Sequence, residues 1–223
     1  MTKADWRRAR IVSNESAASD MITLVLEPFE CIPHEAGQHY DIRFPGEDLS
    51  RAYSIVSAPE RADLLEFGIQ VLPTGQISPR LARTLAGDIL EIRGPLGQFF
   101  NWRPELGRSL ILLGGGAGIT PLISIRDHFN AAFGVGRCRF LMSSKTKDRV
   151  YHYARYRDSL ILRFAESQPR LAKSDLAEGV GDIVSDPDAC ARICGPGSFR
   201  RTMAEYLLSL GMPVARIRSE GFA

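Results

Sequence analysis

The chain has 223 residues, of which 44% are hydrophobic and 24% are charged. This composition is typical of a globular protein and excludes a disordered, collagen-like or disulfide-scaffold chain. Its 28 basic and 26 acidic residues leave a formal net charge of +2, which is too small to make nucleic acid or an anionic membrane the default partner. A chain of this length forms one large domain or two small ones.

The sequence has no clear signal for a membrane span, for secretion or for a cysteine-based site. The longest stretch without a charged residue, Ser109–Ile125, is broken by glycines and a proline, so we expect no membrane span. The N-terminal residues include no apolar segment, so we expect no secretory signal and a cytoplasmic location. The cysteines show no repeated C-x-x-C pair, which favours a reduced chain without a metal site. These cysteines are Cys31, Cys138, Cys190 and Cys194.

The first half of the chain consists of short apolar runs separated by turn residues. Strands at such close spacing predict an antiparallel barrel or sandwich. One helix is expected among them, because Ser78 can cap a helix and Pro79 suits the first helical position, with the pattern continuing to Leu85. The predicted strands are Arg10–Val12, Met21–Leu26, His39–Phe44, Ala52–Val56, Leu64–Leu72 and Ile89–Ile92.

After Gly107 the pattern changes to an apolar run, a glycine turn and a helical period, which is typical of parallel α/β units. Thr120 and Pro121 repeat the combination of cap and proline that begins a helix. The sequence therefore predicts two domains, residues 1–105 and residues 106–223. The predicted elements of the second half are strands at 110–113, 139–142 and 191–194 and helices at 120–133 and 198–210.

A glycine-rich turn, Gly114–Pro121, joins the first buried strand of this second half to its helix. Glycines let the backbone approach a ligand closely, and the free N–H groups of a helix N-terminus attract an anion. The spacing matches neither G-x-G-x-x-G nor the P-loop pattern. Alone, the turn could also be a structural connection, so the other segments decide its function.

Five segments in chain order resemble the ferredoxin–NADP reductase superfamily, above all its stand-alone or oxygenase-associated FAD/NAD(P)H reductases without a fused [2Fe–2S] domain. The resemblance covers essentially the whole chain. It implies an antiparallel β-barrel that binds flavin, followed by an α/β parallel-sheet domain that binds nucleotide. The segments are Arg51–Ser54, Gly94–Phe99, Gly114–Pro121, Cys194–Pro196 and Glu220–Phe222.

The resemblance assigns flavin-binding roles in the first domain. Arg51 would pair with the flavin phosphate, Tyr53 would lie against the isoalloxazine ring, and the Ser54 hydroxyl would hydrogen-bond flavin N5. Without the rest of the pattern, these residues would be read as an ordinary half-buried strand. A second segment resembles the G-x-x-S motif of FAD-binding members, although it could be only a loop and helix cap. Its residues, expected near the FAD pyrophosphate, are Gly75, Gln76, Ile77 and Ser78.

In the second domain the glycine turn resembles the family segment G-T-G-I-A-P, which receives the pyrophosphate of the nicotinamide dinucleotide. Ala117 stands in place of the usual Thr, and Thr120 in place of a small residue. The backbone turn therefore resembles the family segment, whereas the side chains that would contact the ligand differ from it. The residues implied in binding are Gly116, Ala117, Gly118, Ile119, Thr120 and Pro121.

The resemblance also places residues beside the reacting rings. Cys194, followed by Gly195 and Pro196, would border the nicotinamide, although a free cysteine there could be simply a buried core residue. Phe222 would shield the isoalloxazine face until the nicotinamide displaces it. Glu220 would orient Ser54 or the nicotinamide, or move protons. A frayed C-terminus is the alternative for both tail residues.

Residues after the second parallel strand bear on the choice of nucleotide. Basic and hydroxyl side chains there favour the additional phosphate of NADPH, whereas an acidic one favours the ribose of NADH. Ser144, Lys145 and Arg149 favour NADPH, and Asp148 leaves NADH open.

The implied activity is hydride transfer from NAD(P)H to FAD, followed by electron transfer to a separate acceptor, a ferredoxin or an iron–sulfur oxygenase component. The acceptor is expected to be separate because the ligand spacing C-x₄-C-x₂-C of a plant-type ferredoxin is absent. Two alternatives remain: a reductase of free flavin, quinone or ferric chelate, and a non-catalytic flavin- or nucleotide-binding subunit that senses redox state or serves a complex. The sequence indicates no oligomeric state.

Overall fold

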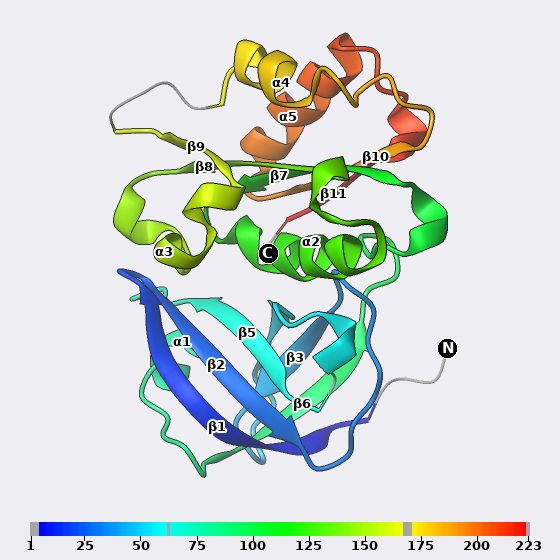
Figure 1. Ribbon diagram of the computed structural model, residues 1–223. Helices are drawn as coiled ribbons and strands as arrows, with labels where there is room; N and C mark the ends of the chain where they lie inside the picture. The colour runs from blue at the N-terminus through cyan, green and yellow to red at the C-terminus, as the bar shows by residue number, and fades with distance from the viewer. Residues whose placement is uncertain (1–4, 62, 167–170, 222–223) are drawn as a thin grey trace.

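The computed structural model describes residues 5–61, 63–166 and 171–221. Figure 1 shows two bodies, a strand-rich one formed by the first half of the chain and a helix-covered sheet formed by the second. The described helices include none that is long and apolar enough to cross a membrane.

The first body is a six-stranded antiparallel sheet in the order β4-β3-β6-β1-β2-β5. An isolated bridge between Ile55, just after β4, and Phe67 in β5 joins the two edges of this sheet, so the sheet curls into a barrel as the short apolar runs predict. The strands are β1 (Arg7–Ala18), β2 (Met21–Pro28), β3 (His39–Arg43), β4 (Ser50–Ser54), β5 (Leu65–Gln70) and β6 (Ile89–Leu96).

The second body is a five-stranded parallel sheet in the order β11-β10-β7-β8-β9. The helices α2 and α3 lie on the face toward the barrel, and α4 and α5 cover the opposite face (Figure 1). The strands are β7 (Ser109–Gly115), β8 (Cys138–Ser144), β9 (Ile161–Phe164), β10 (Ala189–Cys194) and β11 (Ile217–Glu220). The helices are α2 (Ile119–Phe133), α3 (Tyr153–Tyr156), α4 (Lys173–Val180) and α5 (Gly197–Ser209).

Short 3₁₀ segments connect these elements, and none of them is long enough to bury a face of its own. They are η1 (Pro59–Arg61), η2 (Pro104–Leu106), η3 (Gly116–Gly118), η4 (Val135–Arg137), η5 (Lys147–Arg149), η6 (Arg157–Ser159) and η7 (Val214–Arg216).

Two predicted helix starts are wrong in detail. The helix α1 spans only Ser78–Leu81, and no side chain caps it. The Ser78 hydroxyl instead accepts a hydrogen bond from the Leu72 amide at 3.0 Å, so this serine fixes the preceding loop. Thr120 likewise lies inside α2, where its hydroxyl donates to the Ala117 carbonyl at 3.1 Å. Serine and threonine hydroxyls bond nearby backbone groups in several ways, and a cap is only one of them.

The apolar pattern missed β9, β11 and α4. All four residues of β9 are only half-buried, and α4 buries just Leu176 and Val180. β11 includes Arg218 and an exposed Ser219. Strands at the edges of a sheet carry fewer apolar residues than central strands, so their periodicity is weak in the sequence.

A hydrophobic cluster joins the two bodies. Met21 and Val56 of the barrel and Trp102 of the linker, residues 97–108 between β6 and β7, pack with residues of α2 and with the face of the parallel sheet that α2 covers. Trp102 is fully buried, and its ring lies 5.0 Å from that of Phe129 in α2. Because the two bodies share a buried core, they pack against each other as a unit.

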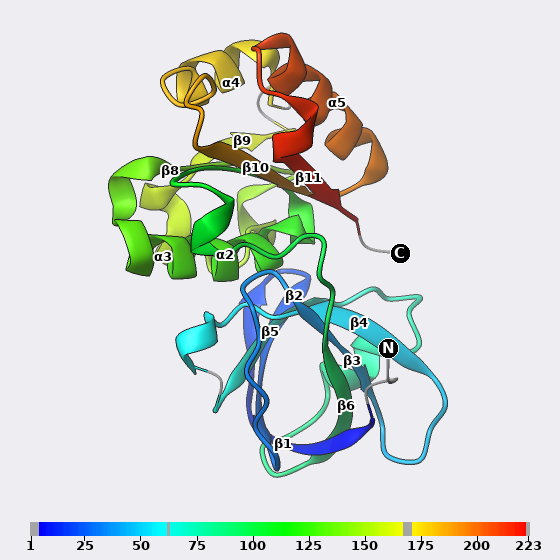
Figure 2. The ribbon, with the colours of Figure 1, turned by 90° about the vertical axis from the view of Figure 1, so that its right-hand side faces the viewer.

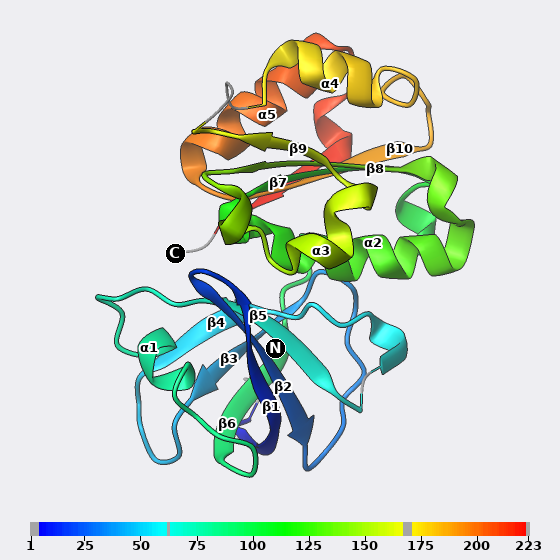
Figure 3. The same cartoon turned by 60° about the vertical axis from the view of Figure 1, so that its left-hand side comes forward.

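A chain of polar side chains also crosses between the bodies. The Tyr151 hydroxyl donates to Glu66 in β5 at 2.9 Å and lies 2.8 Å from the Thr23 hydroxyl in β2. Thr23 in turn lies 2.7 Å from Nε2 of His152. The nearby tip of the β1–β2 hairpin bonds the segment that leads into α3, through Ser19 N–H to the Asp148 carbonyl (Figure 3). Burial raises the pKa of Tyr151 and lowers that of His152.

Replacing Tyr151 with phenylalanine is expected to destabilise the protein by about 2 kcal/mol, because Glu66 loses a buried donor and Thr23 loses a partner. Urea unfolding measures this change. Tyr206→Phe is the control, because the Tyr206 hydroxyl has no hydrogen-bond partner among the described residues. Equal losses in the two variants would show that the bridging hydroxyl contributes nothing.

Candidate functional site

Strand β4 carries the first candidate residues, Arg51, Tyr53 and Ser54, at an edge of the barrel sheet. Arg51 is exposed, and its guanidinium donates only to the Ser50 carbonyl at 2.8 Å, so no described carboxylate neutralises it. Tyr53 is half-buried, and burial raises its pKa to about 12. Ser54 is buried. An unpaired cation beside a partly exposed aromatic ring fits a ligand with a phosphate and a flat ring system.

The loop before α1 holds the second candidate group. Gly75 N–H donates to the Leu72 carbonyl at 2.8 Å, and Ser78 binds the Leu72 amide as described above, so the loop is tied at both ends. Gln76 is exposed, whereas Ile77 and Ser78 are buried. The loop is therefore preorganised, but its serine hydroxyl is already occupied. A ligand could still meet the backbone amides of this segment.

The glycine turn follows β7 directly and lies against β10. Gly116 has a φ of +57°, a left-handed conformation that favours glycine, and a Cβ there would meet no other atom within 4 Å. Gly118 is packed so tightly that a Cβ would overlap the backbone carbonyl of Cys194. The turn is thus open at Gly116 and closed at Gly118. An open αL glycine before a helix N-terminus suits the approach of an anion.

Three candidate positions lie in one row at the carboxyl ends of neighbouring strands. Cys194 of β10 is the register partner of Gly114 in β7 on one side and of Glu220 in β11 on the other. Figure 2 views this edge of the sheet with β11 in front. Open parallel sheets bind ligands beyond the carboxyl ends of their strands. The sheet therefore brings the glycine turn, the cysteine and the glutamate together.

Burial governs the ionisation of this row. Cys194 is fully buried, and burial together with the charge of Glu220 raises the pKa of its thiol, so the thiol stays protonated. Burial also raises the pKa of Glu220, and Arg200 partly opposes this shift. Arg200, at the start of α5, donates to the Gly195 carbonyl at 3.0 Å. The sequence motifs did not point to Arg200, although its position shortly after Cys194–Pro196 could have indicated a role near these residues.

Because the pKa of Glu220 is raised in the folded protein, the folded state holds this proton to a higher pH than the unfolded state does. The free energy of unfolding should therefore fall as the pH rises from the ordinary glutamate pKa through the raised value. In Glu220→Gln this loss should be absent, so the variant gains stability relative to wild type with rising pH. Urea unfolding over that range measures the difference, and parallel curves for the two proteins would refute it.

The residues predicted to choose between NADPH and NADH differ in whether their side chains already have partners. The Ser144 hydroxyl donates to the Thr146 carbonyl at 3.0 Å, and Arg149 lies 3.7 Å from Asp20 of the β1–β2 hairpin. Lys145 is exposed. The neighbouring Thr146 and Ser19 lower the pKa of Asp148, and the Asp148 backbone carbonyl accepts a hydrogen bond from the Ser19 amide. Only Lys145 of the three predicted residues is free of such contacts.

The remaining sequence predictions fall as follows. Gly195 is buried against Gly115, and Pro196 precedes α5. Phe222 lies outside the described residues. None of the four cysteines forms a disulfide with another described residue, and the described residues form no group of three or more side chains suited to a metal ion. Thr120 meets β5 from the second body, since a Cβ on Gly68 would contact both Thr120 and Tyr151.

Comparison with known proteins bears on the first body and on the fold of the chain. Residues 8–101 match the oxidoreductase FAD-binding domain model. The reductase component of propane 2-monooxygenase from Mycolicibacterium smegmatis is 28% identical over 148 residues, which cover 65% of this chain and 42% of that protein. The flavohemoprotein of Bordetella pertussis is 26% identical over 97% of this chain and 60% of its own length. The chain thus spans about half the length of these relatives.

A solved ferredoxin reductase in carbazole 1,9a-dioxygenase superposes with a TM-score of 0.83 at 21% identity, covering 98% of this chain and 70% of that one. At this level of identity, the similarity shows a shared fold and nothing about function. Residues 8–101 therefore match an FAD-binding oxidoreductase domain, and the chain as a whole has the two-domain fold of this solved ferredoxin reductase.

Proposed function

We propose that the chain is an FAD-dependent NAD(P)H reductase that passes electrons to a separate acceptor protein. The observation that carries this proposal is the row formed by Gly114, Cys194 and Glu220 beside the open glycine turn. This row would form a nucleotide-binding edge next to a barrel that matches an FAD-binding domain. We further propose residues 1–105 as the flavin domain and residues 106–223 as the nucleotide domain.

The residues of the barrel fit FAD. Arg51 has no carboxylate partner among the described residues and would pair with phosphate, while the half-buried Tyr53 would stack on the isoalloxazine. Ser54 would hydrogen-bond N5, and the backbone amides of Gly75–Ser78 would meet the pyrophosphate. FAD, when bound, accepts a hydride and releases electrons singly.

The second body would orient the nicotinamide. Residues Gly116–Pro121 of the glycine turn would hold the dinucleotide pyrophosphate, and the protonated Cys194 would form an uncharged wall beside the nicotinamide ring. Glu220, with its raised pKa, could hold a proton near that ring. NADPH is the proposed donor, because the exposed Lys145 has no carboxylate partner among the described residues and would pair with the additional phosphate.

The acceptor is proposed to be a ferredoxin or an iron–sulfur oxygenase component. The support is that similar chains are a reductase component of a monooxygenase and a ferredoxin reductase in a dioxygenase. A cytoplasmic location fits the same proposal.

The decisive test is anaerobic titration of the purified, flavin-loaded protein with NADPH and with NADH. Loss of the oxidised flavin absorbance, faster with NADPH, is expected. A flavin that stays oxidised with both nucleotides would refute the reductase and leave a non-catalytic flavin-binding subunit. Reduction followed by rapid reoxidation by ferredoxin, but slow reoxidation by free flavin, quinone or ferric chelate, would support the protein acceptor. The reverse order would refute it.

A further inference from the structure

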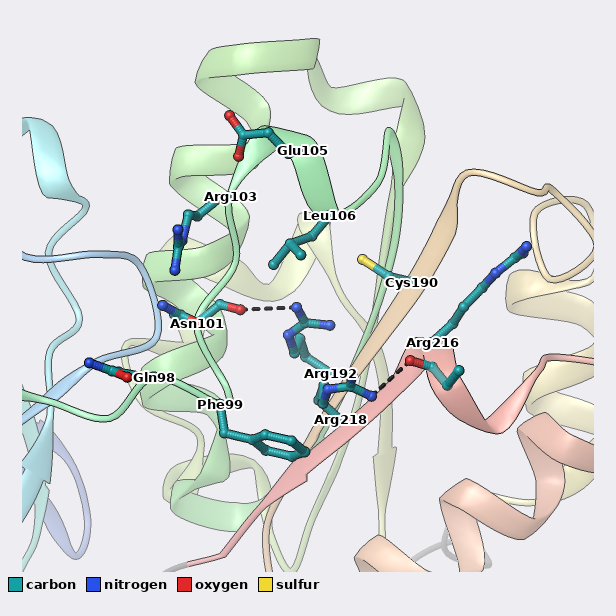
Figure 4. A pocket seen from close by; sticks show the side chains of 11 residues that line it. Gln98, Phe99, Asn101, Arg103, Glu105, Leu106, Cys190, Arg192, Arg216 and Arg218 are labelled. Carbon is teal, nitrogen blue, oxygen red and sulfur yellow. Dashed lines mark hydrogen bonds between the residues drawn. The ribbon is translucent and has the colours of Figure 1, made fainter.

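A cavity of about 610 Å³ lies between the linker after β6 and the strands β10 and β11. Figure 4 shows Arg192 projecting into this space from β10, with Arg218 of β11 next to it and Arg103 of the linker on the far side of Asn101. Phe99 forms its floor in the same view. The cavity has the size of a small-molecule site, and no residue assigned to flavin or nucleotide lines it.

Arg192 is a buried cation without a carboxylate partner. Only 3% of its surface is exposed. Its guanidinium donates to the carbonyls of Phe100 and Asn101 at 2.9 Å each and to that of Ala191 at 3.1 Å. These carbonyls satisfy hydrogen bonds but carry no formal charge. A buried charge without an opposite charge is costly, and this one meets none among the described residues.

Arg218 adds a second positive charge directly opposite the first. Arg192 and Arg218 are register partners on the neighbouring strands β10 and β11, and like charges placed opposite each other in a sheet repel. Arg218 donates through Nη1 to the Ala215 and Ile217 carbonyls and lies 4.9 Å from the Phe99 ring. Its Nε and Nη2 groups have no partner among the described residues, so they can bind a ligand.

The other charged side chains of the cavity do not cancel this pair. Arg103 forms an ion pair with Glu35 at 3.1 Å, and both of its terminal nitrogens are left without a described partner. Arg216 turns away to donate to the Asp186 carbonyl at 3.1 Å. Glu105 points away from Arg192 in Figure 4. The cavity therefore presents at least two uncompensated guanidinium groups.

We propose that this cavity binds a small organic anion bearing two or more phosphate or carboxylate groups. Arg218 and Arg103 would contact the anionic groups, the buried charge of Arg192 would attract them, and the Phe99 ring would cover the apolar part of the ligand. The site lies on the same sheet face as Cys194 and Glu220, two residues earlier on each strand. An anion bound here would hold the linker against β10 and β11 next to the proposed hydride-transfer site.

The test is thermal unfolding and isothermal calorimetry of the purified protein with pyrophosphate in one arm and citrate in the other. Sodium chloride at matched ionic strength corrects for screening. At a hundredfold excess over the dissociation constant, the effective anion should raise the melting temperature by about 5 °C. Arg218→Gln should weaken its binding about tenfold, whereas Arg201→Gln, an exposed arginine of α5, should leave it unchanged.

Pyrophosphate could also bind at the glycine turn. The Arg218→Gln variant distinguishes binding there from binding in the cavity. Binding that Arg218→Gln weakens belongs to this cavity, and stronger binding of pyrophosphate or of citrate identifies the phosphate or carboxylate class. Binding that is equal in Arg218→Gln and wild type would overturn the proposal, and so would failure of both anions to bind. Neither result depends on reduction by NAD(P)H, so the proposed reductase activity is tested separately.

Discussion

Replacing Gly118 with alanine is expected to destabilise the protein by about 3 kcal/mol and to abolish nucleotide binding. The added Cβ would overlap the carbonyl of Cys194 and lie 2.8 Å from the amide nitrogen of Gly195. These are backbone atoms at the end of a central strand, so no flexible side chain can move aside. The turn or the end of β10 must shift, and either shift displaces the row of strand ends proposed to bind the nicotinamide.

Urea unfolding and NADPH titration measure the two parts of this expectation. Gly136→Ala is the matched control, because a Cβ at that exposed glycine meets nothing within 4 Å. The control should unfold and bind nucleotide as the wild type does. If Gly118→Ala behaves like Gly136→Ala, the close packing of the glycine turn on β10 has no energetic importance.

Replacing Tyr53 with alanine is expected to weaken FAD binding about ten- to a hundredfold, because the proposed stacking surface for the isoalloxazine is lost. Tyr53 is half-buried at the edge strand β4 and directly opposite the buried Tyr40. The ring is thus held by the barrel while one side remains accessible. Fluorescence titration of the apoprotein with FAD measures the affinity.

Tyr53→Phe separates stacking from other effects, since it keeps the ring and removes only the hydroxyl. It should retain FAD nearly as well as the wild type. Flavin content after gel filtration gives a second readout. Full retention of flavin by Tyr53→Ala would exclude the ring as the flavin platform and would leave Arg51 as the main candidate on β4.

The buried strands and the glycine turn were predictable because their signals are local. Leu110–Leu113 is a continuous apolar run, and it forms the centre of β7. The helix predicted over residues 120–133 forms α2, which begins one residue earlier, at Ile119. Edge elements were less predictable. β11 includes Arg218 and Ser219, and its strand conformation depends on pairing with β10 rather than on its own apolar pattern.

The sequence by itself determined the order of the elements, the change from antiparallel to parallel units and the presence of a glycine-rich turn between a strand and a helix, because apolar periodicity and glycine act over a few residues. Only the tertiary structure decided which distant residues meet. The pairing of Arg192 with Arg218, and of Cys194 with Glu220, follows from the register of two parallel strands separated by α5. Register is set by packing across the whole sheet, so no local pattern in the chain encodes it.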